Sequence, residues 1–540
     1  MRKERLEKYL PLGIVLLGAL LRLVCLGIVP GGMHQDESLT AWNAFAMFHE
    51  GIDSAGNVWP VYMAGWGDGQ SALYVWLTVP LLFLTGGHAV PYVTRLPQAL
   101  TGIFTLMAVY GIVKRLTGER RLALWSLFAL AICPWHVMMC RWGLEANLAP
   151  GFLIFGLYFF VRGLEEKRFL LLSAFFYGLS LYCYAVIWLI VPLILLLEIG
   201  YGLWQKKLRI DGTGLLAAVI LAVMAMPLML FILVNQGWIA EIRLPFMTIP
   251  VMSGYRGGEV ATNLHWMWRN LRTALSLLWH QNTGAPYDVL LPWGLFYDIG
   301  RIFIVIGAIA LTVKVVQGLW RREYTGETFL FIQLLGGGVL CLFVTAVLHQ
   351  INALYIPLVL CEGYGLWWGL EMLKKRKAAL SRGCAALVVM LYLFSLVGFT
   401  RDYYTEYREV VDAYFGAGIE ECVDCAVEVC RQTGLDTVTV EKGAQWPRLL
   451  LYTETLPSEY LESVVYDVAP APASFMAGDI LIRTRIDMEH IDQDSVYILY
   501  FIDKEKFEQD FDLIQFHDWY VAVPAALGRA AGEQLSYPGK

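Results

Sequence analysis

Long apolar runs separated by short polar connections dominate the first 400 residues of the chain. A helix needs about 20 apolar residues to span a bilayer, and runs of that length recur here. The first run follows a basic N-terminus and is too long for a cleaved signal peptide, so we expect a retained anchor in which Arg22 snorkels outward. The pattern predicts about eleven spanning helices, near residues 9–29, 95–113, 122–139, 148–161, 169–186, 187–204, 212–233, 297–318, 327–347, 353–373 and 380–399.

The lysines decide whether one further run, residues 71–86, also spans. If this run does not span, every lysine between residues 30 and 400 falls on the same side as Lys3 and Lys8, whereas a spanning run breaks the pattern at Lys114. Because cytoplasmic loops are enriched in Lys and Arg, we expect the run to lie along the outer surface and the N-terminus to be cytoplasmic. The outer loops then cover about 30–94, 140–147 and 235–296.

The composition changes after about residue 400, where acidic residues become common. Alternating β-branched and aromatic residues predict strands at Thr437–Val440, Asp479–Arg483, Val496–Tyr500 and Tyr520–Val523. Helical periodicity predicts amphipathic helices at 413–433, 446–462 and 503–511. We therefore expect residues 1–400 to form a membrane domain and residues 401–540 to form a small, separately folding α/β domain outside the membrane.

The overall composition agrees with this picture. The chain is 57% hydrophobic and only 16% charged, whereas soluble proteins carry about a quarter charged residues. No basic patch is interleaved with aromatic residues, which argues against a nucleic-acid partner. Cys422 and Cys425 form one CxxC close to Cys430, but no second pair completes a zinc site, so a helix lining or a disulfide is the expected role.

Polar residues gather on the predicted outer side. Asp36 and Glu37, preceded by His34, stand where the first helix meets water, and ionised groups at this depth tend to mark function. The alternative is an ordinary helix cap. In the second outer loop, Arg141 and Glu145 are four residues apart and can pair on a helix; alternatively, Glu145 faces the first-loop carboxylates while Arg141 meets an anion. The remaining polar candidates at the outer ends of helices are Arg95, Asn147, Arg256, His349 and Asn352.

Carboxylates, arginines and a groove between membrane helices suit the transfer of a sugar from a lipid-phosphate donor. The acceptor hydroxyl needs a general base, which a positioned carboxylate supplies. The leaving phosphate needs arginine forks or a divalent metal, and no P-loop or dinucleotide fingerprint is present. A transporter or flippase of lipid-linked glycans is the alternative, but inverted repeats and broken midplane helices, which are usual in transporters, are not visible. A receptor with an outer sensing domain is a third reading, and it has no need of the acidic pair.

Four short motifs occur in one order along residues 1–400. They are Asp36-Glu37 after the first helix, Arg95-Leu96-Pro97 opening the second, Pro134 followed by Arg141-Trp142-Gly143-Leu144-Glu145, and Asn352 to Pro357 opening a late helix. In this combination the chain resembles the C-type superfamily of membrane glycosyltransferases, specifically family 39. This is the protein O-mannosyltransferase-like group, which has bacterial relatives such as aminoarabinose transferase.

The resemblance implies a C-type glycosyltransferase fold in a bacterial plasma membrane and a polyprenyl-phosphate sugar as donor. It also implies inversion at the anomeric carbon. Asp36 is the expected catalytic base with Glu37 as its neighbour, and a second acidic position maps to Glu145, where many relatives carry Asp. Relatives differ in metal dependence, so the use of a divalent metal stays open. The acceptor is a hydroxyl of a cell-envelope glycan, lipid or protein.

The other candidate residues follow from the same hypothesis. Because a planar guanidinium suits bidentate contact with phosphate, and because the outer loops carry arginine but no lysine, we expect arginines to hold the donor phosphate. These are Arg95, Arg141 and Arg256. The side chains expected to line the substrate cavity are His34, Asn147, His349 and Asn352.

Overall fold

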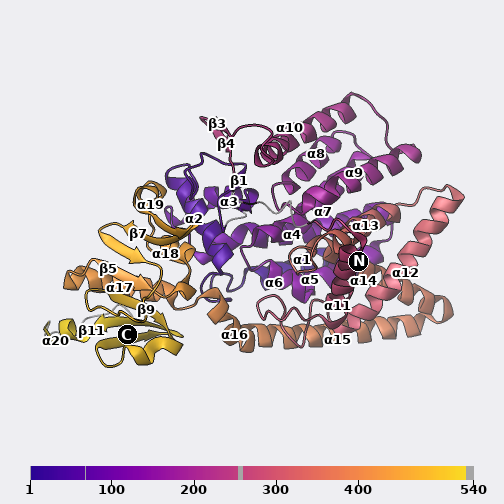
Figure 1. The fold of residues 1–540 in the computed structure, drawn as a ribbon. Helices are drawn as coiled ribbons and strands as arrows, with labels where there is room; N and C mark the ends of the chain where they lie inside the picture. Colours follow the sequence, from indigo (N-terminus) through magenta and orange to yellow (C-terminus); the bar gives the residue numbers. More distant parts are fainter. Residues whose placement is uncertain (1, 67–68, 253, 255–259, 531–540) are drawn as a thin grey trace. The chain divides into compact units, whose positions relative to one another are not determined.

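The computed structural model describes residues 2–66, 69–252, 254 and 260–530. The chain divides into two compact units, whose segments can be followed by their colours in Figure 1. The first unit comprises residues 1–26, 95–230 and 256–407, and the second comprises residues 27–94, 231–255 and 408–540. The second unit thus groups the predicted first outer loop with the C-terminal stretch. Whether residues 401–540 fold separately stays a prediction.

The first unit is helical, as its apolar runs predict. Its elements are α1 (Arg2–Leu23), α4 (Pro91–Thr117), α5 (Arg120–Ile132), α6 (Pro134–Met139), η2 (Glu145–Asn147), α7 (Leu148–Gly163), α8 (Phe169–Ser180), α9 (Ile187–Trp204), α10 (Gly212–Asn235), α11 (Leu264–His280), α12 (Asp298–Arg321), α13 (Glu327–Phe343), η4 (Asn352–Leu354), α14 (Tyr355–Arg376) and α15 (Ala378–Tyr404). Six helical stretches among the described residues are long and apolar enough to cross a membrane. The predicted number of about eleven spans stays a prediction.

The run at residues 71–86 forms two short pieces of helix rather than one long one. The α-helix α3 (Leu73–Thr78) continues into the 3-10 helix η1 (Val79–Thr85). Thirteen residues are too few to span a bilayer core of about 30 Å. Both pieces belong to the second unit, where they contact α2 (Gln35–His49). This arrangement favours the prediction that the run does not span.

Arg22 does not snorkel outward, and this prediction is wrong. Its side chain is fully buried, and its guanidinium donates hydrogen bonds to the carbonyls of Gly18 and Ala131, at 2.8 and 3.0 Å, and of Leu130 at 3.2 Å. A further contact joins it to the ring of His136. Because these acceptors compensate the buried guanidinium, the side chain does not have to reach water.

Two glycines set how closely α12 and α14 approach. A Cβ on Gly307 would lie 1.7 Å from the carbonyl oxygen of Cys361, and a Cβ on Gly365 would lie 2.1 Å from that of Phe303. Backbones of membrane helices pack this closely only where small residues line the contact. The two glycines therefore fix the position of α14 against α12. Helix α14 begins at Tyr355, directly after η4, which contains the candidate residue Asn352.

We expect Gly307→Ala to lower the stability of the purified protein, because the new methyl group meets backbone that cannot move without separating the helices. Overpacking of this kind costs about 1–3 kcal/mol. Gly338→Ala is the matched control: it also lies inside a helix, but a Cβ there meets nothing within 4 Å. Thermal unfolding in detergent should show a lower midpoint for Gly307→Ala and an unchanged or higher one for Gly338→Ala. Equal midpoints would contradict the close packing.

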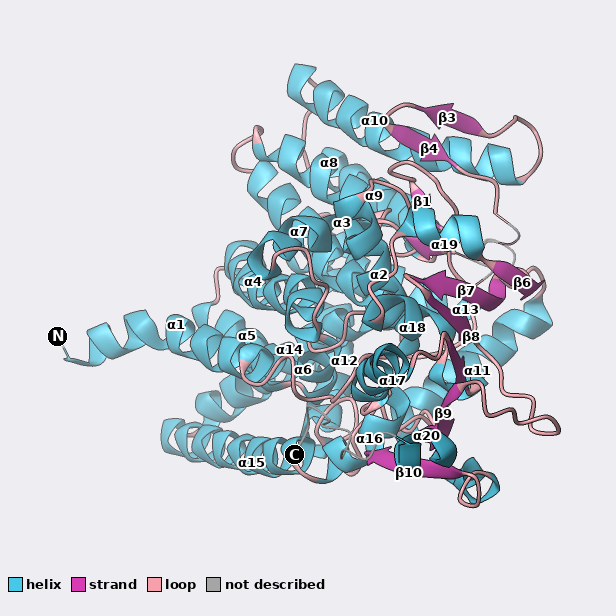
Figure 2. Ribbon diagram, turned by 90° about the vertical axis from the view of Figure 1, so that its left-hand side faces the viewer, coloured by secondary structure: helices cyan, strands magenta, loops and turns pink. Residues whose placement is uncertain are grey.

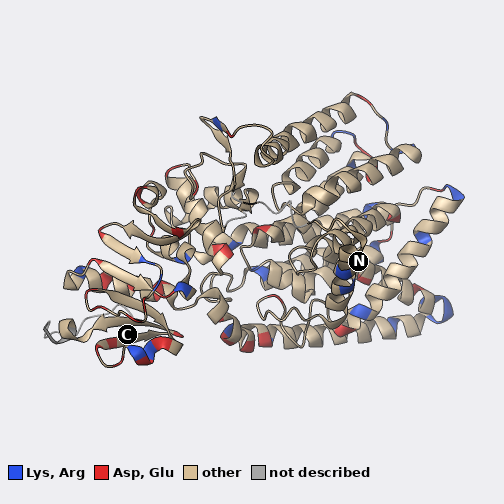
Figure 3. Ribbon diagram, viewed as in Figure 1, with Lys and Arg blue, Asp and Glu red and all other residues tan. Residues whose placement is uncertain are grey.

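The basic connections of the first unit lie together at one end. Arg115, at the end of α4, lies 3.8 Å from Glu165 in the α7–α8 connection. Lys207, between α9 and α10, stacks 4.6 Å from the ring of Tyr324 between α12 and α13. A Cβ on Gly326, in that same connection, would lie 2.0 Å from the carbonyl oxygen of Leu116. In Figure 3 the ribbon is blue, which marks Lys and Arg, at the α12–α13 and α14–α15 connections. The connections that carry lysines thus gather at one end of the unit, as the one-sided lysine pattern predicts, whereas arginines also occur at the other end.

The second unit contains a seven-stranded sheet in the order β10-β11-β9-β5-β8-β7-β6, in which β5 pairs in parallel with β8 and β9 and the other pairs are antiparallel (Figure 2). Its strands are β5 (Thr437–Val440), β6 (Val465–Val468), β7 (Ala471–Ala477), β8 (Ile480–Arg483), β9 (Val496–Tyr500), β10 (Phe511–Phe516) and β11 (Trp519–Pro524). The helices are α2, α16 (Glu406–Phe415), α17 (Ile419–Thr433), α18 (Trp446–Tyr452), α19 (Pro457–Ser463) and α20 (Ala525–Ala530), with 3-10 turns η5 (Lys442–Ala444) and η6 (Phe501–Lys506). Two small hairpins, β1 (Tyr62–Met63) with β2 (Gln70–Ser71) and β3 (Ile242–Leu244) with β4 (Met247–Ile249), complete the unit.

All four predicted strands are present, but the predicted helices need correction. Residues 413–433 form two helices because Gly416 and Gly418 adopt φ angles of 69° and 92°, which stop a right-handed helix. Residues 446–462 likewise divide into α18 and α19. Residues 503–511 are not a helix: η6 ends at Lys506 and strand β10 begins at Phe511.

Helix α2 shares its hydrophobic core with the C-terminal sheet and helices. Trp42 on α2 is fully buried, and its indole N–H donates to the carbonyl of Thr455 at 3.0 Å. The same core contains residues of α17, including Cys422 and Cys425, whose thiols are free. The predicted cysteine cluster is therefore part of a helix lining. The segment that carries the acidic pair is held by the last part of the chain.

Candidate active site

The acidic pair begins helix α2, where His34 and Glu37 form a capping box. The backbone N–H of His34 donates to Glu37 Oε2 at 3.3 Å, and the backbone N–H of Asp36 donates to His34 Nδ1 at 3.3 Å. These bonds satisfy N–H groups that have no partner within the helix. The helix-cap alternative considered from the sequence thus describes Glu37, which is fully buried.

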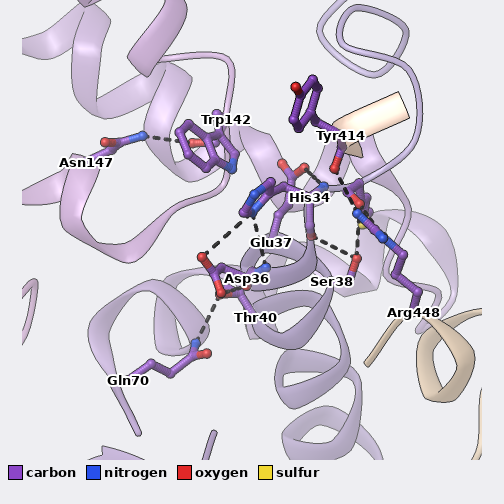
Figure 4. A network of polar contacts seen from close by, with 11 residues as sticks. His34, Asp36, Glu37, Ser38, Thr40, Gln70, Trp142, Asn147, Tyr414 and Arg448 are labelled. Atoms are coloured by element: carbon purple, nitrogen blue, oxygen red, sulfur yellow. Dashed lines mark hydrogen bonds and ion pairs between the residues drawn. The ribbon is translucent and has the colours of Figure 1, made fainter. Parts of the chain in front are cut away.

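Asp36 differs from its neighbour in exposure. Its carboxylate is 38% exposed and lies 3.7 Å from His34 Nδ1 (Figure 4). Its backbone carbonyl accepts a hydrogen bond from Thr40 Oγ1 at 3.0 Å, and the Thr40 hydroxyl accepts one from Gln70 Nε2 at 3.0 Å. The backbone of Asp36 is therefore anchored while its carboxylate remains accessible. This is the geometry that a proton acceptor for a substrate requires.

Arg448 on α18 is a site residue that the sequence reasoning missed. Its Nε donates to the carbonyl of Met33 at 2.9 Å and its Nη2 to the carbonyl of Tyr414 at 3.0 Å (Figure 4). Burial lowers the pKa of this guanidinium, and the negative charges of Glu37 and Asp36 act in the opposite direction. Arg448 therefore fixes the turn before α2 and places a buried positive charge near both carboxylates. No sequence motif surrounds it, and only the fold reveals it.

In the first unit, two of the predicted phosphate-binding arginines meet at the end of α1. Arg95 donates to the carbonyl of Leu26 at 3.1 Å. Arg141 donates to the carbonyls of Val24 at 2.7 Å and Cys25 at 3.0 Å, and to the hydroxyl of Tyr403 at 3.2 Å. These carbonyls belong to the turn that follows α1, and the two arginines supply hydrogen-bond donors for them. Both guanidinium groups are fully buried.

Tyr407, the last residue of the first unit, lies among the charges of this region. Burial raises the pKa of its hydroxyl, the charge of Asp288 raises it further, and Arg95 and Arg141 oppose the rise. The hydroxyl donates to the carbonyl of Tyr287 at 3.3 Å. Two arginines and one carboxylate therefore act on a single phenol. Asp288 joins the candidate residues on this ground.

Three of the predicted cavity residues, Asn147, His349 and Asn352, line one narrow crevice together with Asp288. Asn352 Nδ2 donates to the carbonyl of Ala146 at 2.7 Å, while its Oδ1 is buried and has no hydrogen-bond partner among the described residues. Asn147 Nδ2 donates to the carbonyl of Trp142 at 3.4 Å (Figure 4). A buried carbonyl oxygen without a donor is costly, so a substrate N–H or O–H would be favoured there.

Glu145 is the first residue of η2 and is buried. Helix α6 ends at Met139, so Arg141 and Glu145 do not share a helix face. The pairing considered from the sequence assumed one continuous helix, and the two residues do not lie on one. Glu145 instead precedes Ala146 and Asn147, which the bond to Asn352 joins to the crevice.

Asp288 also lines a larger cleft of about 740 Å³ beside α11. The cleft is lined by Arg269, Arg272 and His265 of that helix, and Asp288 is buried at 8% exposure. In the sequence, Asp288 is the single acidic residue between residues 260 and 296. A lone carboxylate in a predicted outer loop is the signal that could have identified it.

Because burial raises the pKa of Asp288, the free energy of unfolding of the protein should depend on pH. Burial raises the pKa of this carboxylate to about 6, and a hydrogen bond from Thr283 opposes the rise. An Asp in the unfolded chain titrates near about 3.9, so between about pH 4 and 6 the folded protein binds this proton more tightly, and stability falls as the pH rises through that window. Asp288→Asn removes the effect. Relative to the parent protein, the variant should gain roughly 2–3 kcal/mol between pH 4 and 7.

Unfolding at several pH values, monitored in detergent, measures this difference. Asp298→Asn is a suitable control, because that carboxylate is 78% exposed and should show no comparable change. A constant difference between Asp288→Asn and the parent protein across the window would show that folding does not raise the pKa of Asp288.

Arg256 lies outside the described residues. Among the described residues, no group of three or more His, Cys, Asp or Glu side chains could hold a metal ion.

A helical membrane unit with buried polar groups near the ends of its helices, and a second unit with a C-terminal sheet, define the C-type glycosyltransferase fold. The chain matches the structure of ArnT from Cupriavidus metallidurans in the apo state with a TM-score of 0.54 at 13% identity, covering 95% of this chain and 97% of that chain. The structure of ArnT bound to undecaprenyl phosphate matches with a TM-score of 0.52 at 13% identity, over 95% and 97% of the two chains. The predicted fold class is thereby confirmed.

The oligosaccharyltransferase of Archaeoglobus fulgidus, in complex with Zn and sulfate, matches with a TM-score of 0.50 at 12% identity, covering 82% of this chain and 61% of that chain. Residues 72–241 match the family model described as dolichyl-phosphate-mannose-protein mannosyltransferase. The predicted resemblance and the predicted enzyme class, a membrane glycosyltransferase, are confirmed by this match together with the fold. No curated protein matches the chain.

Proposed function

We propose that the protein transfers a sugar from a polyprenyl-phosphate donor to a hydroxyl of a cell-envelope glycan, lipid or protein, with inversion at the anomeric carbon. The observation that carries this proposal is the division of the acidic pair, with Glu37 buried in the cap of α2 and Asp36 exposed beside it. An anchored but accessible carboxylate suits a general base. The similarity of the fold to ArnT bound to undecaprenyl phosphate supports a polyprenyl-phosphate donor.

In the proposed reaction, the acceptor oxygen attacks the anomeric carbon while Asp36 takes the proton of the acceptor hydroxyl. The bond between the anomeric carbon and the phosphate oxygen breaks, and the polyprenyl phosphate leaves with the electron pair. Attack from the face opposite the phosphate inverts the configuration. Glu37 and His34 hold the start of α2 and so fix the direction of the Asp36 carboxylate.

Arginine side chains stabilise the leaving phosphate in this proposal. Arg95, with its charge beside Tyr407, is the leading candidate, and Arg141 and Arg256 complete the proposed set. Arg141 also binds carbonyls of α1 and the hydroxyl of Tyr403, so its replacement should harm folding as well as donor binding. Asn147, His349, Asn352 and Glu145 serve the sugar or the acceptor.

The proposed location is a bacterial plasma membrane with the basic end of the first unit in the cytoplasm. The N-terminus is then cytoplasmic, and residues 401–540 are extracytoplasmic. The acidic pair acts on the outer face of the membrane, where the acceptor is found.

The decisive experiment is transfer of labelled sugar from polyprenyl-phosphate donors to envelope acceptors by the purified protein in detergent. We expect labelled acceptor and released polyprenyl phosphate in equal amounts. A transporter or flippase would move intact donor across vesicles without releasing polyprenyl phosphate. That result, with no transfer for any donor tested, would overturn the proposal.

A further inference from the structure

A groove of about 360 Å³ lies in the first unit, at the end where the basic connections meet. It is formed by the start of α5, the last turns of α14 and the first turns of α15. It lies away from Asp288, Asn352 and the other candidate residues of the unit, none of which lines it. The residues that line it are Arg121, Trp125, Trp367, Leu370, Glu371, Lys374, Ala378, Ser381, Arg382 and Ala385.

The charge of the groove is unbalanced. Arg121 Nη1 and Lys374 Nζ both contact the carboxylate of Glu371, at 3.1 and 2.7 Å. Arg382 adds a third cation, and Glu371 is the only carboxylate among the lining residues. The groove therefore carries an excess of positive charge, which an anion would compensate.

Two further features supply hydrogen-bond donors. Helix α15 begins at Ala378, and its N-cap residue Lys377 makes no side-chain cap, so the first N–H groups of the helix and its positive dipole end are unoccupied by a side chain. The indole N–H of Trp367 is buried and has no hydrogen-bond partner among the described residues. A phosphate could accept hydrogen bonds from the N–H groups at the start of α15, since helix N-termini bind such anions readily.

The other walls of the groove are apolar. Trp125, Leu370 and Ala385 line it. A ligand that fits both parts has an anionic head and an apolar tail.

We propose that this groove binds an anionic phospholipid, with the phosphate at Arg382, Lys374 and the N-terminus of α15 and an acyl chain along α15. Basic pockets between membrane helices are a known setting for anionic lipid heads. A free phosphate would leave the apolar wall uncovered. The proposal does not depend on the sugar transfer proposed above, because none of the candidate site residues takes part in it.

Native mass spectrometry of the purified full chain, titrated with phosphatidylglycerol, tests the proposal. The double variant Lys374→Gln/Arg382→Gln should bind this lipid roughly thirtyfold more weakly, since each basic residue near an anionic lipid contributes about 1 kcal/mol. The matched control is Lys375→Gln/Arg376→Gln, which makes the same charge change on the same helix end but lies outside the groove. It should leave binding unchanged, and phosphatidylcholine should bind every variant weakly.

A second variant keeps the test valid if the double variant does not fold. Ala385→Trp fills the groove and retains all its charges, so it should also weaken phosphatidylglycerol binding. Equal losses in the two double variants would show non-specific attraction and overturn the proposal. Displacement of the lipid by millimolar inorganic phosphate would show a simple anion site and would equally overturn it.

Discussion

Asp36→Asn should nearly abolish sugar transfer while leaving the amount of folded protein and its donor affinity close to normal. Removal of a general base typically lowers a rate by about 10²–10⁴-fold. Asparagine keeps the shape of the side chain, and the bond from Thr40 to the Asp36 backbone carbonyl is unaffected by the change. Transfer rates measured with saturating donor, together with a separate donor-binding assay, test the prediction.

Glu37→Gln is the matched control for Asp36→Asn. Glutamine can replace glutamate at this position of a capping box, so the bond to the His34 N–H should survive and activity should fall much less. If Glu37→Gln is instead the more damaging variant, the base is Glu37. If both variants retain full activity, the acidic pair is only a helix cap, and the proposed function loses its main support.

Arg448→Met should lower both stability and activity. The change leaves the buried carbonyls of Met33 and Tyr414 without their donors, at a cost of about 1–3 kcal/mol for each unsatisfied group. It also removes a positive charge that acts on both carboxylates. If Asp36 is the base, the acidic limb of the pH–rate profile should move to higher pH, and at pH values on that limb the rate should fall about tenfold per unit of displacement.

The pH profile separates this positioning role from a purely structural one. Arg448→Lys retains the charge and should restore the position of the limb, although it loses the two-sided hydrogen bonding of the guanidinium. Arg431→Met, at an exposed arginine of α17, is the control and should change neither quantity. If Arg448→Met lowers stability but leaves the profile and the rate per folded molecule unchanged, Arg448 acts only on the fold.

The secondary structure could be predicted from the sequence wherever one physical period dominates. The strands at Thr437–Val440 and Val496–Tyr500 appear with the predicted bounds, since β-branched and aromatic residues give an unambiguous signal. Strand β10 was missed because Phe511–Phe516 directly follows charged residues that suggest a helix. The helical period also continues across Gly416 and Gly418, and only their backbone conformation shows the break.

The candidate site could be predicted only in part. The adjacent carboxylates and the asparagine at position 352 follow helix ends, and such positions can be identified from the sequence. Arg22 and Arg448 could not be understood in this way, because their acceptors are carbonyl groups 109 and 415 residues away. Hydropathy describes what a side chain costs to bury, but it carries no information about a distant partner that compensates this cost.

Because α2 shares its core with the C-terminal sheet, α2 can be covered only late in the synthesis of the chain. Trp42 and Thr455, joined by a hydrogen bond, are 413 residues apart in the chain. Because a chain is synthesised from its N-terminus, α2 is complete long before the strands and helices that cover it exist. Until the C-terminal segment has been synthesised, the apolar face of α2 has to be shielded from water by other means. A ribosome-bound intermediate that lacks only the last strands would therefore contain the carboxylates that we propose as catalytic, but not the complete core that holds α2.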